Sequence, residues 1–207
     1  MEKELKIRLD RYSYNHILSL YKPSKTITQI NSFFDTQDSY FRRQKTAFRI
    51  RNENEDQFFA ALKHTVSITN GYSKADEIEQ KLTESEYKAL IALDTNAFIS
   101  LLKTIVRAES DPADYTTQLF KGLDMGLVTG FKKTGEFKNI RKNVSMGVFT
   151  IELDKTFFTA ERIEYELECE TDEDRLSSLL DQLGIFLTHI EYMKKSKYER
   201  YLKHKGS

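Results

Sequence analysis

The sequence has few of the residues that cross-link or interrupt a chain. In 207 residues it has one cysteine, Cys169, two prolines, eight glycines and no tryptophan. A single cysteine excludes a disulfide within the chain, and no Cys/His cluster has the spacing of zinc ligands. No apolar run approaches the roughly 18 residues of a membrane-spanning helix, and no charged-then-apolar leader opens the chain. These absences favour a cytoplasmic protein without a membrane partner.

The numbers of basic and acidic residues are balanced. Lys+Arg and Asp+Glu both number 32, so the formal net charge is zero. A general binder of nucleic-acid polymers is usually basic, and we therefore expect no such partner. Apolar residues make up 39% and charged residues 31%, which is typical of a globular chain. The length suits a single domain over residues 1–207.

Strand patterns dominate the first third of the chain, with one helix among them. The helix is expected at residues 11–21, before Pro23, and the strands at 2–10, 26–36, 46–53, 57–66 and 72–80. After these strands, the spacing of apolar residues changes from every second position to the three- or four-residue spacing of helices. Thr83 and Glu86 form a predicted capping box, apolar residues follow at helical spacing to Ile105, and Asp111-Pro112 begins a third short helix. This helical insert spans about 83–120.

Strands are expected again at 127–134, 137–144, 147–155 and 161–170, with turns near Gly135 and Gly147. A C-terminal helical region at about 172–204 follows, with one helix ending at Gly184 and a short basic helix after it. About eight antiparallel strands with helices between and after them make an α+β class. Eight strands suffice to close a barrel wide enough for a small ligand.

Several of these strands alternate charged and apolar residues. Glu2, Glu4, Lys6 and Arg8 alternate with Leu5 and Ile7, and other strands repeat the pattern with Arg49/Arg51, Glu77/Glu79, Glu152/Asp154 and Glu164/Glu166/Glu168/Glu170. For any one strand, a solvated face is the ordinary interpretation. Together, the faces are almost purely charged and rich in Glu, which strands disfavour. Glutamates at every second position repel one another unless Lys, Arg or a divalent metal ion neutralises them.

The residue types also indicate a kind of ligand. Carboxylate oxygens suit Mg²⁺ or Mn²⁺, and Mg²⁺ usually takes one or two carboxylates plus substrate phosphates. Arg49 and Arg51, with Lys63 on the next strand, supply the forked and point charges that bind phosphate oxygens. The pattern therefore predicts a cavity for a metal-bound polyanion, and by itself it goes no further.

The order of the motifs resembles that of the CYTH family, the triphosphate tunnel metalloenzymes. The chain has Glu-x-Glu-x-Lys at residues 2–6, Arg-x-Arg at 49–51, Lys63, and Glu-x-Glu at 77–79. It continues with Leu-Asp-Lys at 153–155, Glu-Leu-Glu at 166–168 and Ser-Lys-Tyr at 196–198. The resemblance runs from residue 2 to about 202 and is closest to short bacterial members often labelled adenylate cyclases.

The resemblance implies a closed eight-stranded antiparallel barrel whose charged side chains line a tunnel and bind triphosphate with Mg²⁺ or Mn²⁺. It implies metal binding by Glu2, Glu4, Glu168 and Glu166, and catalytic roles for Glu166 and Lys6. The implied phosphate clamp consists of Lys6, Arg49, Arg51, Lys63, Lys197 and either Lys132 or Lys133, and the other tunnel-lining residues are Glu77, Glu79, Glu152, Asp154, Arg8 and Arg141. Many members have Arg where this chain has Lys132-Lys133, which leaves substrate preference open.

Hydrolysis of inorganic tripolyphosphate or a similar small triphosphate is the leading hypothesis for function. The alternatives are an adenylyl cyclase making cyclic AMP from ATP, a thiamine triphosphatase, and a non-catalytic module that binds polyphosphate or nucleotides. A binder of anions gains nothing from carboxylates unless they hold a metal ion, so the paired glutamates favour an enzyme. The sequence leaves the oligomeric state open between monomer and homodimer.

Overall fold

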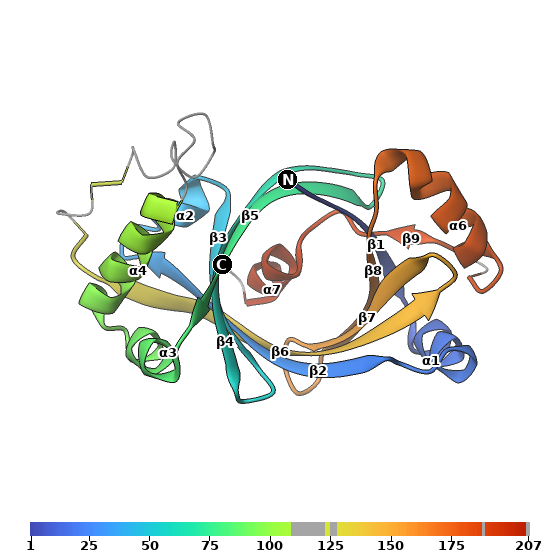
Figure 1. Ribbon diagram of the computed structural model, residues 1–207, viewed down its shortest axis with the longest axis horizontal. Coiled ribbons are helices and arrows are strands. Elements are labelled where there is room, and N and C mark those ends of the chain that lie inside the picture. The colour runs from blue at the N-terminus through green and yellow to red at the C-terminus, as the bar shows by residue number, and fades with distance from the viewer. Residues whose placement is uncertain (109–122, 125–127, 188, 206–207) are drawn as a thin grey trace. The chain divides into compact units, whose positions relative to one another are not determined.

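The computed structural model describes residues 1–108, 123–124, 128–187 and 189–205 (Figure 1). Its strands are β1 (Glu2–Leu9), β2 (Lys25–Thr36), β3 (Thr46–Glu53), β4 (Gln57–Thr69), β5 (Tyr72–Leu82), β6 (Phe131–Met146), β7 (Phe149–Phe157), β8 (Ile163–Glu170) and β9 (Glu191–Tyr192). Its helices are α1 (Arg11–Leu20), α2 (Tyr40–Arg43), α3 (Glu84–Ile91), α4 (Thr95–Ala108), the 3₁₀ turn η1 (Glu173–Arg175), α6 (Leu176–Gly184) and α7 (Lys197–Lys205).

Strand pairing closes the sheet on itself. The order is β5-β4-β3-β2-β6-β7-β8-β1, and β1 also pairs with β5, from Glu2 opposite Ala75 to Leu5 opposite Tyr72. The short strand β9 adds to the other end of β1, where Ile7 lies opposite Tyr192. The α+β class and the closed eight-stranded antiparallel barrel are therefore confirmed.

One of the two turns expected among these strands needs correction, and the other is confirmed. The sequence predicts a turn near Gly135 between two strands, but β6 runs unbroken through that residue for 16 residues. Gly135 is buried within the strand and is not among the glycines with positive φ in the described part of the chain. The turn at Gly147 is confirmed, since this residue has a φ of 59° and joins the paired residues Met146 and Phe149. The helix expected at Asp111-Pro112 falls outside the described residues.

Contacts divide the chain into two compact units. Unit 1 comprises Met1–Ile30, Thr65–Ala75 and Phe137–Ser207, and unit 2 comprises Asn31–His64 and Asp76–Glu136. No helix in the described part of the chain is long and apolar enough to cross a membrane.

The core of unit 1 lies between its strands and two helices. Leu5 and Ile7 on β1 are fully buried, as are Leu153 on β7 and Leu167 on β8. They pack in one cluster with Ile17 of α1 and with Leu179 and Leu183 of α6. Figure 1 shows α1 and α6 on one side of β1, β7 and β8, and α7 on the other. The apolar residues of these alternating strands therefore pack under α1 and α6, which leaves the charged residues on the face toward α7.

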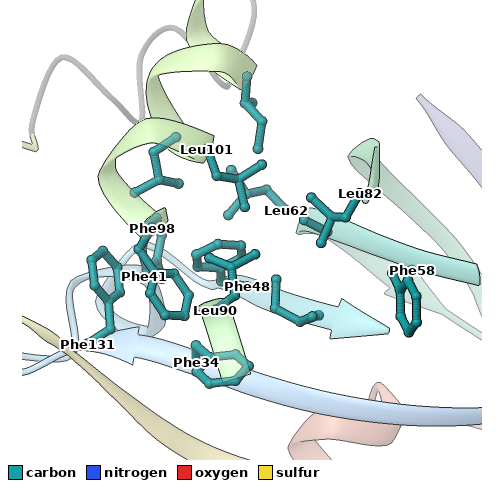
Figure 2. Packing of buried hydrophobic residues seen from close by; sticks show 14 of the residues in the cluster. Phe34, Phe41, Phe48, Phe58, Leu62, Leu82, Leu90, Phe98, Leu101 and Phe131 are labelled. Carbon is teal, nitrogen blue, oxygen red and sulfur yellow. The ribbon is translucent and has the colours of Figure 1, made fainter. Parts of the chain in front are cut away.

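Unit 2 has its own core, which is built largely from phenylalanines (Figure 2). Phe98 of α4 is fully buried, and its ring stacks on Phe131 at 4.3 Å between centroids and contacts Phe34 at 5.2 Å and Phe48 at 5.6 Å. The capping box that begins α3 is confirmed, because the Thr83 hydroxyl accepts from the Glu86 backbone N–H and the Glu86 carboxylate accepts from the Thr83 N–H.

Candidate active site

The register of four strands in unit 1 places charged residues in rows. Directly opposite residues of antiparallel strands have their side chains on the same face. Lys6 of β1 lies opposite Glu168 of β8, which lies opposite Glu152 of β7. In the next row, Arg8 lies opposite Glu166, Glu166 opposite Asp154 of β7, and Asp154 opposite Arg141 of β6. The charged positions of the alternating pattern thus form one continuous face across β6, β7, β8 and β1.

Most of this charged face is buried, although Arg8 is 40% exposed at its side chain. Asp154 is 0% exposed, Glu166 1%, Glu4 4% and Glu168 5%, and Lys6 is 8% exposed. The apolar residues between them on the same strands are buried as well, so neither face of these strands is an ordinary solvated one. Burial of ionised groups costs several kcal/mol each unless partners compensate, and here Lys6, Lys197 and Arg141 pair with the carboxylates.

Glu168 accepts hydrogen bonds from three cations of the face. Its Oε1 accepts from Lys6 Nζ at 2.6 Å and from Lys197 Nζ at 2.6 Å, and its Oε2 accepts from Arg141 Nη2 at 2.5 Å. Burial alone would raise the pKa of this carboxyl, but Lys197, Lys6 and Arg141 outweigh it and hold the pKa well below its ordinary value. Glu168 is therefore ionised at neutral pH.

Arg141 bridges three carboxylates on its own. Its Nε and Nη2 donate to the two oxygens of Asp154 at 2.9 and 2.7 Å, and it also pairs with Glu168 and Glu152. Burial opposes ionisation of Asp154, yet Arg141 and Lys197 lower its pKa below the ordinary value. For Glu152 burial prevails over the attraction of Arg141, and its pKa is raised.

Helix α7 supplies the second lysine of the face. Lys197 Nζ lies 2.6 Å from Glu168 Oε1, 2.9 Å from Asp154 Oδ2 and 3.4 Å from Glu166 Oε2. Burial would lower the pKa of Lys197, but these three carboxylates raise it. The pKa of Lys6 is raised in the same way, against burial, by Glu168 and Glu4. Both lysines therefore keep their positive charge.

In unit 2 the predicted phosphate-binding cations are paired with the predicted glutamates. Arg49 Nη2 donates to Glu77 Oε1 at 2.7 Å, and Lys63 Nζ lies 2.9 Å from Glu77 Oε2. Arg51 pairs with Glu79. Phe48 and Ile50 alternate with the two arginines along β3 and pack in the aromatic core at 1% and 0% exposure, so the arginines lie on the opposite face.

The two candidate lysines at the start of β6 have different partners. Lys132 Nζ donates to the Gln37 carbonyl at 2.7 Å and to Ser39 Oγ at 2.9 Å, next to the start of α2. Lys133 is exposed and pairs with Glu136 Oε2 at 2.6 Å. Within the described residues, no ion pair joins either lysine to Glu77 or Glu79.

The carboxylates of unit 1 fit a divalent metal ion in donor type. No group of three or more His, Cys, Asp or Glu side chains in the described part of the chain is arranged to hold one. Mg²⁺ does not require such a group, because it usually takes one or two carboxylates and completes its shell with water and substrate phosphates. One buried carboxylate oxygen, Glu166 Oε1, has no hydrogen-bond partner among the described residues, which is unusual and suits a ligand. Glu2 lies at the start of β1, opposite Ala75.

One residue of the charged face is missing from the sequence-based set. Arg200 of α7 is 6% exposed and donates to Glu166 Oε2 at 2.5 Å and to Glu164 Oε2 at 3.0 Å. It follows Lys197 by three positions, and residues three apart on a helix share a face. That spacing could have identified it once the tail was expected to be helical.

Solved structures with the same fold are known. HpAC1 from Hippeastrum, described as a candidate adenylyl cyclase with a dominant triphosphatase activity, is 25% identical with a TM-score of 0.80, and the match covers 99% of this chain and 96% of that chain. A candidate adenylate cyclase from Bacillus halodurans is 20% identical with a TM-score of 0.62, covering 97% of this chain and 98% of that chain. No curated protein sequence matches the chain. The CYTH domain matches residues 1–202, and the chain therefore belongs to the CYTH family.

Proposed function

We propose that this protein is a divalent-metal-dependent hydrolase of inorganic tripolyphosphate or a similar small triphosphate. The observation that carries the proposal is the buried charged face of unit 1, where four carboxylates at 5% exposure or less meet Lys6, Lys197 and Arg141. A buried ion-pair network is often no more stable than an apolar core of the same volume. A metal-bound triphosphate would bind to both parts of such a network, the metal ion to the carboxylates and the phosphate oxygens to the cations.

The similarity to HpAC1 supports hydrolysis in particular, since a triphosphatase activity is dominant in that protein. Phosphoryl transfer asks the protein mainly to position the reactants and to neutralise charge, with little covalent chemistry. The charged face of unit 1 has side chains for both tasks, so no Cys, Ser or His nucleophile is required.

The roles divide among the side chains by charge. Glu2, Glu4 and Glu168 would hold Mg²⁺ or Mn²⁺, and the bound ion would neutralise charge on the phosphate oxygens. Lys6 and Lys197 carry ammonium groups that can bind phosphate oxygens once a substrate competes for their carboxylate partners. Glu166, with one unpartnered oxygen, would accept a hydrogen bond from the attacking water. The parts assigned to Arg49, Arg51, Lys63, Lys132 and Lys133 rest on the family resemblance.

Phosphate release from tripolyphosphate, ATP and thiamine triphosphate, each with Mg²⁺ or Mn²⁺, tests the proposal. Tripolyphosphate should be the best substrate, and the double change Glu2→Gln, Glu4→Gln should abolish metal-dependent turnover. The matched control is Glu173→Gln, which changes an exposed carboxylate of the same unit. Cyclic AMP from ATP with tripolyphosphate left intact would establish the cyclase instead. Metal-dependent binding of tripolyphosphate without turnover would establish a binding module.

A further inference from the structure

The two oxygens of the Glu166 carboxylate have unlike surroundings. Oε2 accepts from Arg200 Nη2 at 2.5 Å and lies 3.4 Å from Lys197 Nζ. Oε1 is equally buried but has no hydrogen-bond partner in the part of the chain that the structure describes. A buried carboxylate oxygen without a partner is costly, so such an atom calls for an explanation. One half of this carboxylate is thus tied to the protein while the other half is left available.

Arg200 is itself rigidly held. Its Nη1 donates to the Lys195 carbonyl at 2.8 Å and its Nε to Glu164 Oε2 at 3.0 Å, and its Cζ lies 6.0 Å from the centre of the Phe158 ring. With Nη2 on Glu166, every nitrogen of the guanidinium has an acceptor. Because the guanidinium is planar and its donors are fixed relative to one another, these contacts determine where Nη2 lies. The orientation of the Glu166 carboxylate follows from that position.

We propose that Arg200 is a positioning residue that fixes Glu166 so that Oε1 is free to accept a hydrogen bond from the attacking water. The inference rests on the proposed function. It adds Arg200, a residue that the sequence motifs do not include. The guanidinium of Arg200 donates to Glu164, Glu166 and the Lys195 carbonyl, so its proposed effect on the reaction is exerted through Glu166. A lysine at this position carries the same charge but cannot reach Glu164, Glu166 and the Lys195 carbonyl with one planar group.

Residue Arg162 offers a matched control within the same network. Its Nε and Nη2 donate to Glu164 Oε1 at 3.1 and 2.5 Å, so it binds the same glutamate as Arg200 but through the other oxygen. It is 37% exposed at its side chain, and no ion pair or hydrogen bond links it to Glu166 within the described residues. A change at Arg162 therefore acts on Glu164 Oε1, while Arg200 keeps its own contacts with Glu164 Oε2, Glu166 Oε2 and the Lys195 carbonyl.

The test compares Arg200→Lys with Arg162→Lys in the full chain, with tripolyphosphate and Mg²⁺. For Arg200→Lys, kcat should fall about 10- to 100-fold with KM within about threefold, because displacement of a reacting group by about 1 Å can cost that much. For Arg162→Lys, both constants should stay within about twofold, as expected for an exposed ion pair. Calorimetric binding of tripolyphosphate without metal should be equal in the three proteins.

Two further measurements separate a positioning role from a structural one. The thermal midpoints of the two variants should agree within a few degrees, and a crystal structure of the Arg200→Lys protein should show the Glu166 carboxylate turned from its orientation in the parent. A parent-like kcat for Arg200→Lys would overturn the inference, and so would an equal loss in both variants. If the parent itself hydrolyses no triphosphate, the proposed function fails first, and that outcome is recognised before any variant is compared.

Discussion

Lys6 of β1 lies directly opposite Glu168 of β8, and its ammonium donates to the Glu168 carboxylate at 2.6 Å with both side chains buried. In most antiparallel sheets such a cross-strand pair is exposed and contributes little to stability. Here the pair lies inside unit 1, below Lys197 of α7, which binds the same carboxylate oxygen. Because this pair is buried, the stability of the protein depends on whether the carboxylates of the charged face are ionised.

Stability should therefore fall in acid. The pKa values of Asp154 and Glu168 are held below their ordinary values of 3.8 and 4.5, despite burial, by Arg141, Lys197 and Lys6. A carboxyl with a lowered pKa in the folded state stabilises that state fully above its unfolded pKa, and the contribution is lost as the pH falls through the folded value. Urea midpoints should be flat just above pH 5 and decline below about pH 4.5. Glu152, whose pKa is raised, acts in the opposite direction.

Asp154→Asn provides the control for this acid dependence. The variant should be less stable at pH 7, and its urea midpoint should decline less than that of the parent between pH 5 and the acid limit. An acid dependence that is as steep in the variant as in the parent would show that other carboxyls are responsible.

Removal of Arg141 should destabilise the protein strongly. Arg141 is the shared partner of Asp154, Glu152 and Glu168, and Arg141→Met leaves these carboxylates short of a cation in a buried site. The free energy of unfolding at pH 7 should fall by about 3–5 kcal/mol. Arg43→Met is the comparison, because Arg43 is 53% exposed in its pair with Asp38, and its loss should cost less than about 1 kcal/mol. Similar losses in the two variants, measured by urea unfolding, would contradict the importance given to burial.

The cap of α3 gives a prediction that is independent of function. Thr83→Ala removes the hydroxyl that accepts from the Glu86 backbone N–H, and the free energy of unfolding should fall by about 1 kcal/mol. Ser85→Ala, at an exposed position of the same helix, should change stability by less than about 0.5 kcal/mol. Chemical denaturation of the two variants side by side decides the matter, and an equal effect would rule out the cap as the cause.

The sequence predicts much of this architecture for a simple reason. The strand at residues 2–10 alternates in polarity from Glu4 onward, and Thr83 with Glu86 is a local signal that needs no tertiary information. Gly135 misleads because glycine marks turns on average, whereas here the long strand β6 carries it in extended backbone. The short strand β9 has no pattern of its own, since two residues pairing with β1 leave no periodicity to detect.

The charged residues of the site could be predicted from the sequence, but the ion pairs between them could not. Alternation identifies Glu166 and Glu168 as sharing a face, yet it cannot tell whether that face meets water or a second layer. The answer depends on α7, which covers the face with Lys197 and Arg200. Their reach across 29 and 34 residues to Glu168 and Glu166 is a tertiary contact that strand periodicity does not encode.

Loss of Glu166 should affect turnover rather than substrate binding. Glu166→Gln keeps the size of the side chain but removes the charge that would orient the attacking water, so kcat for tripolyphosphate should fall about 10²- to 10⁴-fold. KM should change little, because Glu166 is assigned to the attacking water and not to the phosphate oxygens. Glu170→Gln, an exposed position on the same strand, is the control and should match the parent. An unchanged kcat in the Glu166 variant would remove this residue from the mechanism.

Arg49 should act on substrate binding. Arg49→Gln removes a forked cation that the family resemblance assigns to phosphate, and KM for tripolyphosphate should rise about tenfold with kcat nearly unchanged. Arg42→Gln, which changes an exposed arginine of α2 in the same unit, should leave KM at the parental value. A fall in kcat at constant KM would assign Arg49 to the chemical step instead, and this result would contradict its proposed role.

Phosphorus NMR of tripolyphosphate mixed with the parent protein tests the central claim most directly. With Mg²⁺ or Mn²⁺ present, the tripolyphosphate resonances should be replaced by those of pyrophosphate and orthophosphate in equal molar amounts. Without a divalent ion, or with the Glu2→Gln, Glu4→Gln protein, they should persist. Tripolyphosphate that stays intact beside the parent and metal, while the charged face of unit 1 is correctly folded, would contradict the account.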